Sequence, residues 1–296
     1  MSILVSEPEL LSSGHGLLEA PLWHPQLGLL AADASVGGVW RFSFDESAQV
    51  VVPHRRGIGG MALHIDGGVV VGGRNIAYKA LQSAQASSDT IALLQNDPAR
   101  GVVGFNDLTT DAAGRIYVGS LGFVPMHGET ADGKPGSLHV IDLDGSSRVV
   151  AKDVALSNGL GFSPDGTRLY HADSSRHLVR CYEVLDTGEL SAPTVFARVT
   201  NGLPDGLAID AAGVVWVAVA HGNAVIAFSP QGVELARIRI PVPMVTSLCF
   251  GGPDLRDLYV FTGSEGSPNL KACIFHVRVE VPGLPIAAAR VRLGSQ

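Results

Sequence analysis

The sequence has few cysteines, no long hydrophobic run and an N-terminus without a basic segment. Its three cysteines are far apart, odd in number and without a CxxC pair: Cys181, Cys249 and Cys273. We therefore expect a reduced, cytoplasmic protein rather than a disulfide scaffold. No apolar stretch approaches the roughly 18 residues that a membrane-spanning helix needs. The first residues, MSILVSEPELLSSG, include two acids, so they do not predict a signal peptide.

Basic residues are also scarce and scattered. Lysine and arginine together number 21 against 28 acidic residues, which gives a net charge of −7 without a basic block. This composition argues against a nucleic-acid partner. Hydrophobic residues make up 46% of the 296 residues, enough for a large core, and they come in short bursts such as GVVWVAVA (213–220), which suit buried strands. The only helix-compatible stretch is YKALQSAQA (78–86).

A short unit recurs six times along the chain. Its copies are HPQLGLLAAD, HIDGGVVVGG, DAAGRIYVGS, SPDGTRLYHAD, DAAGVVWVAV and GGPDLRDLYVFTG. Their turns fall at Gly28, Gly67, Gly114, Gly166, Gly213 and Asp254, spaced 39, 47, 52, 47 and 41 residues apart. Each copy predicts a hairpin, and a further strand-like run often follows it. Three or four strands in each unit are typical of a β-propeller. We predict an all-β, six-bladed propeller that forms a single domain over residues 1–296; the alternative is a β-sandwich with accidental turn similarity.

The repeat predicts which side chains meet at the channel of the propeller. The first strand of each blade lines the channel, so equivalent residues just before these strands lie around one mouth. The positions eight or nine residues before the turns are Glu19, Gly59, Asn106, Asn158, Asp205 and Thr246. Four of the six therefore carry a carboxylate or an amide, and we expect these four to converge.

Two carboxylates and two amides shielded from water are costly unless something compensates them. A divalent cation does so, and these hard oxygen ligands suit Ca²⁺, Mg²⁺ or Mn²⁺. Three protein ligands would leave positions open for water and substrate, as in a catalytic site. The alternative is that Asn and Asp only cap turns at the strand starts.

The segments that follow the second strands return to the same face. The longest is 120–136, which we interpret either as a lid or as a disordered insertion. Polar residues in or beside these segments are Arg74, Asp173, His221 and Glu265. Each is either a substrate contact or a solvated turn residue.

These residues resemble the senescence-marker protein (regucalcin) / gluconolactonase / luciferin-regenerating enzyme family along nearly the whole chain. The matching pieces are LLEAPLWHP, GFNDLTTDAAGRIYVGSL, LSNGLGFSPDGTRLYHADS, LPDGLAIDAAGVVWVA and VTSLCFGGPDLRDLYV. The resemblance implies one divalent metal, Ca²⁺, Zn²⁺, Mn²⁺ or Fe²⁺, held by Glu19, Asn158 and Asp205. It also implies lactone hydrolysis, with Asn106 contacting the substrate or a water on the metal. Asp107 follows Asn106 in the same motif and is a further expected contact.

This reaction agrees with the predicted site. A cation polarises the lactone carbonyl and stabilises the oxyanion, while a carboxylate takes the proton of the attacking water. The resemblance assigns that base to Asp205. No G-x-S-x-G nucleophile motif is present.

One departure from the family pattern concerns the substrate. Sugar-lactone members often have arginine two residues before the asparagine, where this chain has Gly104. The nearby apolar set is Leu121, Phe123, Val124, Pro125 and Met126. We therefore expect a small-molecule lactone less polar than a sugar acid lactone, with Phe123, Arg74 and His221 as contacts; Arg74 could also replace the missing arginine.

Two other functions remain open at this point. One is a regulatory propeller that binds Ca²⁺ without turnover, and the other is a hydrolase of another ester or phosphoester bond on the same site. The sequence does not predict an oligomeric state.

Overall fold

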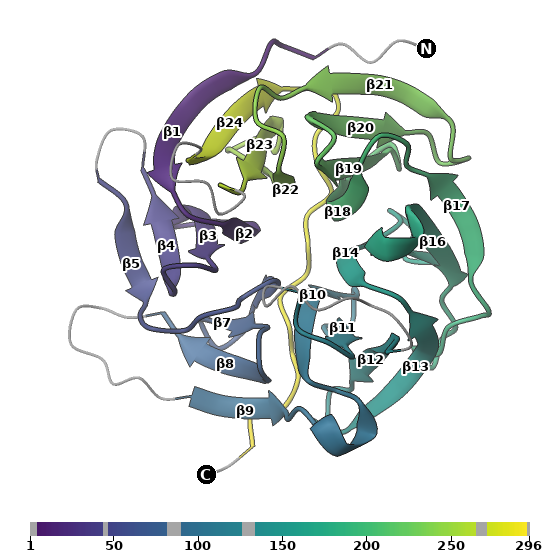
Figure 1. Ribbon diagram of the computed structural model, residues 1–296. Coiled ribbons are helices and arrows are strands. Elements are labelled where there is room, and N and C mark those ends of the chain that lie inside the picture. Colours follow the sequence, from purple (N-terminus) through teal and green to yellow (C-terminus); the bar gives the residue numbers. More distant parts are fainter. Residues whose placement is uncertain (1–4, 44–46, 82–89, 126–133, 265–270, 295–296) are drawn as a thin grey trace.

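Six four-stranded antiparallel sheets surround a central channel, as Figure 1 shows in a view along its axis. This computed structural model describes residues 5–43, 47–81, 90–125, 134–264 and 271–294. The structure includes two short 3-10 turns, η1 (Pro98–Arg100) and η3 (Ser174–Arg176). None of the described helices has the length and apolar character to span a membrane. The predicted all-β, six-bladed propeller is therefore confirmed.

Each of the first five blades is built from four consecutive strands. Blade 1 contains β2 (Leu18–His24), β3 (Gly28–Asp33), β4 (Val39–Phe42) and β5 (Gln49–Val52). Blade 2 contains β6 (Met61–Leu63), β7 (Gly68–Val71), β8 (Ile76–Ala80) and β9 (Thr90–Leu94). Blade 3 contains β10 (Gly104–Thr110), β11 (Ile116–Leu121), β12 (Gly136–Ile141) and β13 (Ser147–Val154). Blade 4 contains β14 (Ser157–Phe162), β15 (Arg168–Asp173), β16 (Leu178–Glu183) and β17 (Thr194–Arg198). Blade 5 contains β18 (Leu203–Ile209), β19 (Val215–Ala220), β20 (Ala224–Phe228) and β21 (Glu234–Arg239).

The sixth blade joins the two ends of the chain. It contains β22 (Val245–Gly251), β23 (Asp257–Thr262) and β24 (Ala272–Arg278), with β1 (Glu9–His15) as the outermost strand. Strand β1 pairs antiparallel with β24, from Glu9 opposite His276 to His15 opposite Ala272. Hydrogen bonds between the N-terminal and C-terminal parts of the chain therefore close the ring.

The turns between first and second strands follow the predicted repeat in five blades. Their glycines, Gly28, Gly67, Gly114, Gly166 and Gly213, have φ between 70° and 92°, a region that glycine enters at little cost. In the sixth blade two turn residues have positive φ, Gly252 at 79° and Leu255 at 55°, and the Leu255 N–H donates to the carbonyl of Gly252. The turn position is thus one residue later than the predicted Asp254. The Asp254 carboxylate instead pairs with Arg278.

The helix-compatible stretch at 78–86 does not begin as a helix. Tyr78 and Lys79 belong to β8, where they pair with Val70 and Val69 of β7. The pairing of the whole sheet overrides the local helical propensity. Residues 82–86 lie outside the described residues.

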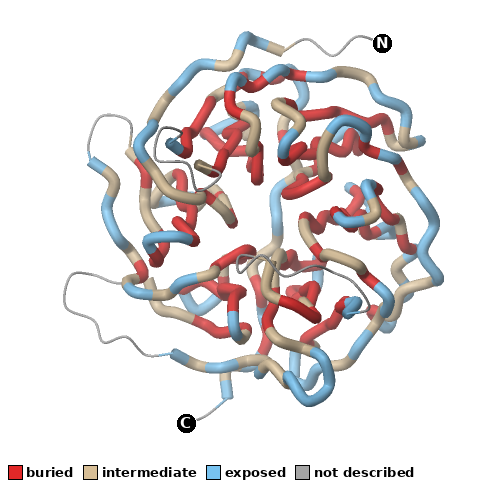
Figure 2. The backbone as a smooth tube through the Cα atoms, in the orientation of Figure 1, coloured by how far each residue is buried: buried red, intermediate tan, exposed pale blue. Residues whose placement is uncertain are grey.

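The hydrophobic core lies mainly between neighbouring blades. One cluster joins Trp216 and Val225 of blade 5 to Leu258, Val260 and other side chains of blade 6. Figure 2 shows the inner and middle strands mostly buried, whereas the outermost strands carry the exposed positions. The buried bursts in the sequence are therefore the strands nearest the axis.

Residues 282–292, here called the C-terminal strap, cross the channel on the side of the glycine turns. In Figure 1 this yellow segment runs through the middle of the ring and ends beside β9. Its backbone bonds several blades in succession: Leu284 N–H donates to Ile209, Ala289 N–H to Leu63, and Arg290 N–H to Gly114. The Thr110 hydroxyl donates to the carbonyl of Ala287. The strap therefore ties blades 5, 3 and 2 together across the far mouth.

Candidate functional site

The candidate site lies at the opposite mouth, where the innermost strands begin. In five blades the register of this strand shifts: between Glu19 and Leu22, Phe105 and Leu108, Ser157 and Leu160, Pro204 and Leu207, and Val245 and Ser247. Such bulges bend a strand and redirect its side chains. Asn106, Asn158 and Asp205 are each the first bulged residue. Glu19 stands one position earlier, directly before Ala20, whose φ is 53°. This difference explains the nine-residue offset of Glu19 in the repeat.

Glycines allow these strands to approach one another closely. A Cβ on Gly159 would lie 2.4 Å from the amide nitrogen of Leu207, and one on Gly206 would lie 2.8 Å from the Cα of Ser247. We call the six equivalent residues at this mouth the ring. Gly59 is the ring residue of blade 2, and a Cβ there would lie 1.8 Å from Asn106 Oδ1. Blade 2 therefore supplies space, rather than a ligand, to the ring.

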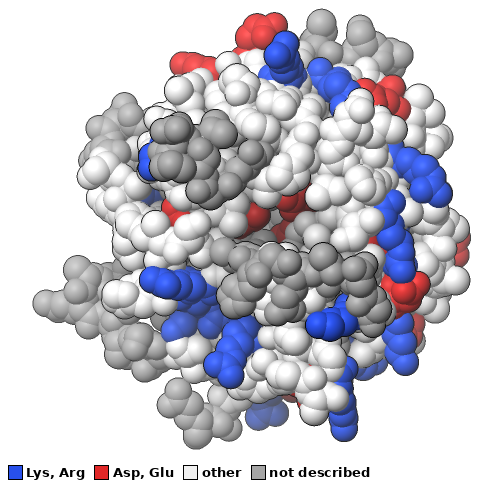
Figure 3. All heavy atoms as spheres, in the orientation of Figure 1, with Lys and Arg blue, Asp and Glu red and all other residues white. Residues whose placement is uncertain are grey.

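Three carboxyl groups share this mouth without a basic partner. Asp205 is buried, and Glu19 and Asp107 are half-buried. Burial, followed by repulsion from Asp205 and Asp107, raises the pKa of Glu19 well above its usual value. Burial and then Asp107 likewise raise the pKa of Asp205, whereas a hydrogen bond from Gly206 N–H lowers it. Burial raises the pKa of Asp107 to about 7. Among the described residues, no lysine or arginine offsets these shifts. Figure 3 shows acidic atoms at the floor of the central depression.

The two asparagines are joined by hydrogen bonds. Asn106 Nδ2 donates to the carbonyl of Ser157, at 2.8 Å, and also to Asn158 Oδ1. Asn158 Nδ2 donates to the hydroxyl of Ser174, at 2.8 Å. The side-chain amide of Asn106 therefore donates its hydrogen bonds to blade 4, a contact that the sequence repeat did not predict.

The ring position of blade 6 also has a structural partner. Thr246 is fully buried, and its hydroxyl donates to the carbonyl of Leu18, at 2.6 Å. Leu18 directly precedes Glu19. Thr246 thus anchors the strand that carries Glu19 instead of facing the channel as a ligand.

A serine and a histidine lie beneath Asn158 in hydrogen-bonding distance. Ser157 Oγ and His171 Nε2 are 2.7 Å apart, and both residues are fully buried. Burial lowers the pKa of His171 to about 3, so it is neutral at ordinary pH. Although this pair resembles part of a serine hydrolase, neither side chain is open to a substrate. It supports the backbone next to Asn158.

The remaining predicted contacts fall into different environments. Arg74 and His221 are exposed at the ends of the segments that follow β7 and β19. Phe123 is only 3% exposed, so its ring packs inside the protein. Asp173 is fully buried, accepts hydrogen bonds from the N–H groups of Ala155 and Leu156, and pairs with arginines of its own blade. Its carboxylate is therefore committed to the fold, so of the two alternatives Asp173 is the turn residue, although it is buried and not solvated.

Two of the predicted positions cannot be placed. Glu265 and Met126 lie outside the described residues, as does 126–133, the middle of the segment interpreted as a lid. These interpretations remain predictions.

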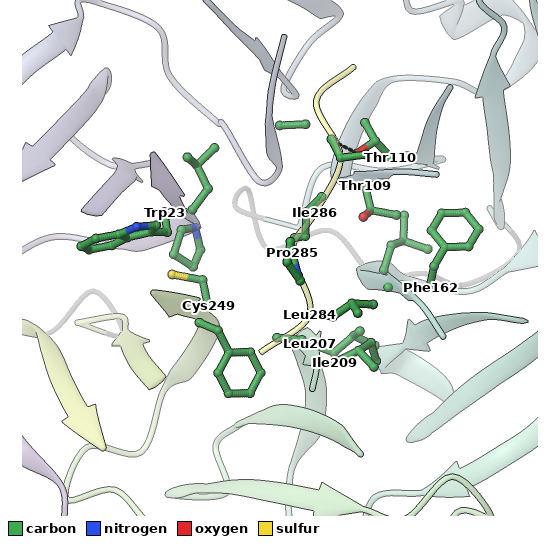
Figure 4. Close-up of a pocket in the computed structure, with 18 of the residues that line it drawn as sticks. Trp23, Thr109, Thr110, Phe162, Leu207, Ile209, Cys249, Leu284, Pro285 and Ile286 are labelled. Atoms are coloured by element: carbon green, nitrogen blue, oxygen red, sulfur yellow. Dashed lines mark hydrogen bonds between the residues drawn. The ribbon is translucent and has the colours of Figure 1, made fainter. Parts of the chain in front are cut away.

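Below the ring, the channel widens into a cavity of about 650 Å³. The innermost strands line it with mostly apolar residues, among them Trp23, Phe162 and Leu207, and the strap contributes Leu284 and Ile286 (Figure 4). Its acidic lining residues are Asp107, which follows Asn106, and Asp165, which lies in the turn at the far mouth. A mostly apolar chamber therefore lies behind the carboxyl and amide groups of the open mouth.

The donor set fits a hard divalent cation. No three His, Cys, Asp or Glu side chains of the described residues are grouped so as to hold a metal ion by themselves. The ring instead combines two carboxylates, Glu19 and Asp205, with the amide oxygen of Asn158. Oxygen ligands of this kind suit Ca²⁺ and Mg²⁺, and a cation would offset the mutual repulsion that raises the carboxyl pKa values.

Comparisons with known proteins point to one family. The family model described as SMP-30/Gluconolactonase/LRE-like region matches residues 17–264. Pentonolactonase XacC of Haloferax volcanii is 32% identical over 292 residues, covering 93% of this chain and 95% of that protein. The 6-deoxy-6-sulfogluconolactonase of Pseudomonas putida is 32% identical over 276 residues, covering 90% and 92%. Regucalcin of Xenopus laevis is 31% identical, covering 84% and 83%.

The fold is also shared with solved structures. A luciferin-regenerating enzyme superimposes with a TM-score of 0.82 at 23% identity, and the match covers 98% of this chain and 100% of that chain. Regucalcin of Agrobacterium tumefaciens, described as a calcium-binding protein, gives 0.81 at 21% identity, covering 95% and 97%.

Proposed function

This chain belongs to the SMP-30/gluconolactonase/LRE-like family, and on that premise we propose that it is a metal-dependent hydrolase that opens a lactone. The observation that carries the proposal is the convergence of Glu19, Asp107 and Asp205 beside the amide of Asn158, without a basic side chain to balance them. Two relatives named as lactonases match nine-tenths or more of this chain. Glu19, Asn158 and Asp205 would hold the cation, with Ca²⁺ the most natural ion and Zn²⁺, Mn²⁺ or Fe²⁺ as alternatives.

The chemistry assigns a separate task to each group. When bound, the cation would polarise the lactone carbonyl and stabilise negative charge on its oxygen. Asp205, as a carboxylate, takes a proton from the water that attacks the carbonyl carbon. The carbon–oxygen bond of the ring then breaks, and the departing ring oxygen takes the proton back from Asp205. The product is a hydroxy acid, which releases one proton at neutral pH.

The surroundings of Gly104 support a polar substrate. A Cβ on Gly104 would lie 3.2 Å from the Gly73 carbonyl and 3.9 Å from the Cα of Arg74. Phe105 and Gly73 pair through their backbones at the same place. The segment that carries Arg74 therefore lies directly against the position of a side chain at 104, and we assign to Arg74 the task of the missing arginine. A guanidinium grips hydroxyl or carboxylate groups, and Phe123 is buried. We therefore propose a polyhydroxy lactone as the substrate, and not the less polar lactone expected from Gly104 alone. His221 would be a second contact at the rim.

A panel of lactones tests the proposal. Protein stripped with a chelator and then loaded with a single metal should release acid from sugar lactones, measured by pH-stat, and more slowly from alkyl-substituted lactones. Arg74→Ala should raise KM for the polar lactones selectively. No turnover of any lactone by metal-loaded protein at high concentration would overturn the proposal.

The second candidate is a propeller that binds Ca²⁺ without turnover, and the similarity to regucalcin favours it. Calcium binding by calorimetry, together with silence on the whole lactone panel, would support this alternative. Adding phosphoesters to the panel tests the remaining possibility of another hydrolytic reaction on the same site.

A further inference from the structure

The hydrogen bonds of Ser174 determine which way the carboxamide of Asn158 points. Ser174 has one hydroxyl hydrogen. Its Oγ lies 2.5 Å from the carbonyl oxygen of Pro204, which can only accept, so the hydrogen is used there. Toward Asn158 the same oxygen must then accept, and the group facing it, at 2.8 Å, has to be the NH₂. The amide oxygen of Asn158 is left on the opposite side, toward Asn106 and the ring.

A second donor fixes the same orientation from the other end. Asn106 Nδ2 donates to the carbonyl of Ser157, again an obligatory acceptor, and to Asn158 Oδ1. If Asn158 were flipped, its NH₂ would face the NH₂ of Asn106, and its oxygen would face the acceptor lone pair of Ser174. Both hydrogen bonds would be lost at once, in a mostly buried place.

We propose that Ser174 is a positioning residue that keeps the amide oxygen of Asn158 turned toward the metal site, so that blade 4 supplies a ligand oxygen rather than an amide N–H. This inference rests on the metal site of the proposed function. It concerns a residue outside the ring, because Ser174 lies in η3, after the second strand of blade 4. The oxygen of a carboxamide can serve a cation, whereas its NH₂ cannot.

The surroundings hold Ser174 itself in place. It is 1% exposed, and its N–H donates to the carbonyl of Leu156, at 2.9 Å. The preceding residue, Asp173, is pinned by Arg176 and Arg180. The ion pairs that exclude Asp173 from the substrate site therefore fix the start of the turn that presents Ser174.

The same type of contact recurs at the other two proposed ligands. In each case a side chain of the preceding blade in the ring donates to the carbonyl just before a ligand: Thr246 to Leu18, before Glu19; Asn106 to Ser157, before Asn158; and Ser174 to Pro204, before Asp205. Ser174 differs from Thr246 because it also bonds a ligand side chain directly. It is therefore the point at which Asn158 and Asp205 are held relative to each other.

Calorimetric metal titration of chelator-stripped protein tests the role of Ser174. Ser174→Ala should weaken binding of the metal that wild type prefers by about 10-fold to 100-fold, the range typical of residues that orient metal ligands. Ser174→Thr keeps the hydroxyl and should restore most of the affinity. Ser163→Ala is the matched control, because Ser163 is a buried serine of the same blade whose hydroxyl bonds the turn at the far mouth. Its metal affinity should equal that of wild type.

The same substitution in an Asn158→Asp protein tests whether Ser174 acts through the amide of Asn158. In Asn158→Asp both side-chain atoms are oxygens, so either orientation supplies a ligand, and adding Ser174→Ala should then change metal affinity by less than about 3-fold. If Ser174→Ala lowers metal affinity equally in both backgrounds, the inference is overturned. It is also overturned if wild type binds metal and Ser174→Ala binds it with the same affinity. Wild-type protein that binds no divalent cation would instead overturn the proposed metal site, and this inference with it.

Discussion

The two mouths of the channel are made from the two ends of the same inner strands, yet their chemistry differs. At one mouth the strands begin with bulges that gather Glu19, Asp205 and two asparagines around the axis. At the other mouth they end in left-handed turns, and the strap covers the opening. Blade 5 shows the contrast within one strand and its turn. Asp205 has carboxyl neighbours, whereas Asp210 accepts hydrogen bonds from Ala212 N–H, Val214 N–H and the Trp216 indole.

Under the proposed function, a carboxylate at the open mouth takes part in the reaction, whereas one at the closed mouth stabilises the fold. The difference follows from the partners that the backbone supplies. A tight turn offers several N–H groups to a carboxylate, whereas a bulge beside a channel exposes the side chain without satisfying it. The two mouths should therefore respond to mutation in opposite ways.

The largest effect is expected when each of two aspartates of blade 5 is replaced by asparagine. Asp205→Asn should lower kcat by about 10³-fold, since the proposed general base is lost, while the Tm of the metal-free protein stays the same or rises. Asp210→Asn should keep activity but lose about 1 to 3 kcal/mol of stability, because an NH₂ now faces backbone donors. Lactone turnover and thermal unfolding measured on both variants check this. Full activity in Asp205→Asn would show that another group is the base.

A glycine at each mouth of blade 2 offers the next comparison. In Gly59→Ala the new methyl would collide with Asn106 Oδ1, so kcat should fall by at least about 10-fold as the asparagine pair is displaced. In Gly67→Ala nothing lies within 4 Å of the new methyl. Its positive φ should cost only about 1 kcal/mol of stability, with activity retained. Equal kcat values in the two variants would contradict the role given to Gly59.

The unpaired carboxyl groups predict how the stability of the metal-free protein depends on pH. Asp107 has an ordinary pKa of 3.8, raised to about 7 in the fold, and the pKa values of Glu19 and Asp205 move in the same direction. Stability that is present at low pH is therefore lost as pH rises through about 7. Buried His171, with its lowered pKa, has the opposite effect only below about 6.5.

Thermal unfolding of chelated wild type and Asp107→Asn between pH 4 and 8 measures this effect, because the contribution of His171 is common to both proteins. The Tm of Asp107→Asn should rise relative to that of wild type as the pH increases from 4 to about 7, and added metal should raise the Tm of wild type most at pH 8. A Tm difference that does not change with pH would mean that the carboxyl groups are compensated in some other way.

The smallest effect is expected at the strap. Val291 is 1% exposed, so Val291→Ala should cost about 1 to 2 kcal/mol of stability through lost burial. Ile286 is 62% exposed, and Ile286→Ala should change stability by less than about 0.5 kcal/mol. Both variants should keep wild-type kcat on the preferred lactone. Loss of activity in Val291→Ala without unfolding would show that the two mouths are coupled.

The sequence by itself determined the architecture and the membership of the ring. Six hydrophobic units at regular spacing specify six blades, because each sheet can bury its faces only against its neighbours. The offset from each turn then identified Glu19, Asn106, Asn158 and Asp205 as residues of one mouth. Local pattern suffices here because a repeat places equivalent residues at equivalent positions around an axis.

Only the tertiary structure decided what these side chains contact. The hydroxyl of Ser174 and the amide of Asn106 meet partners about 30 and 51 residues away in sequence, and no periodicity encodes such pairs. The sequence pattern also does not encode the ion pairs of Asp173 with arginines of its blade, or the burial of Phe123. Hydrogen-bond direction and burial depend on which chains lie side by side in space, so they emerge only once the ring has closed.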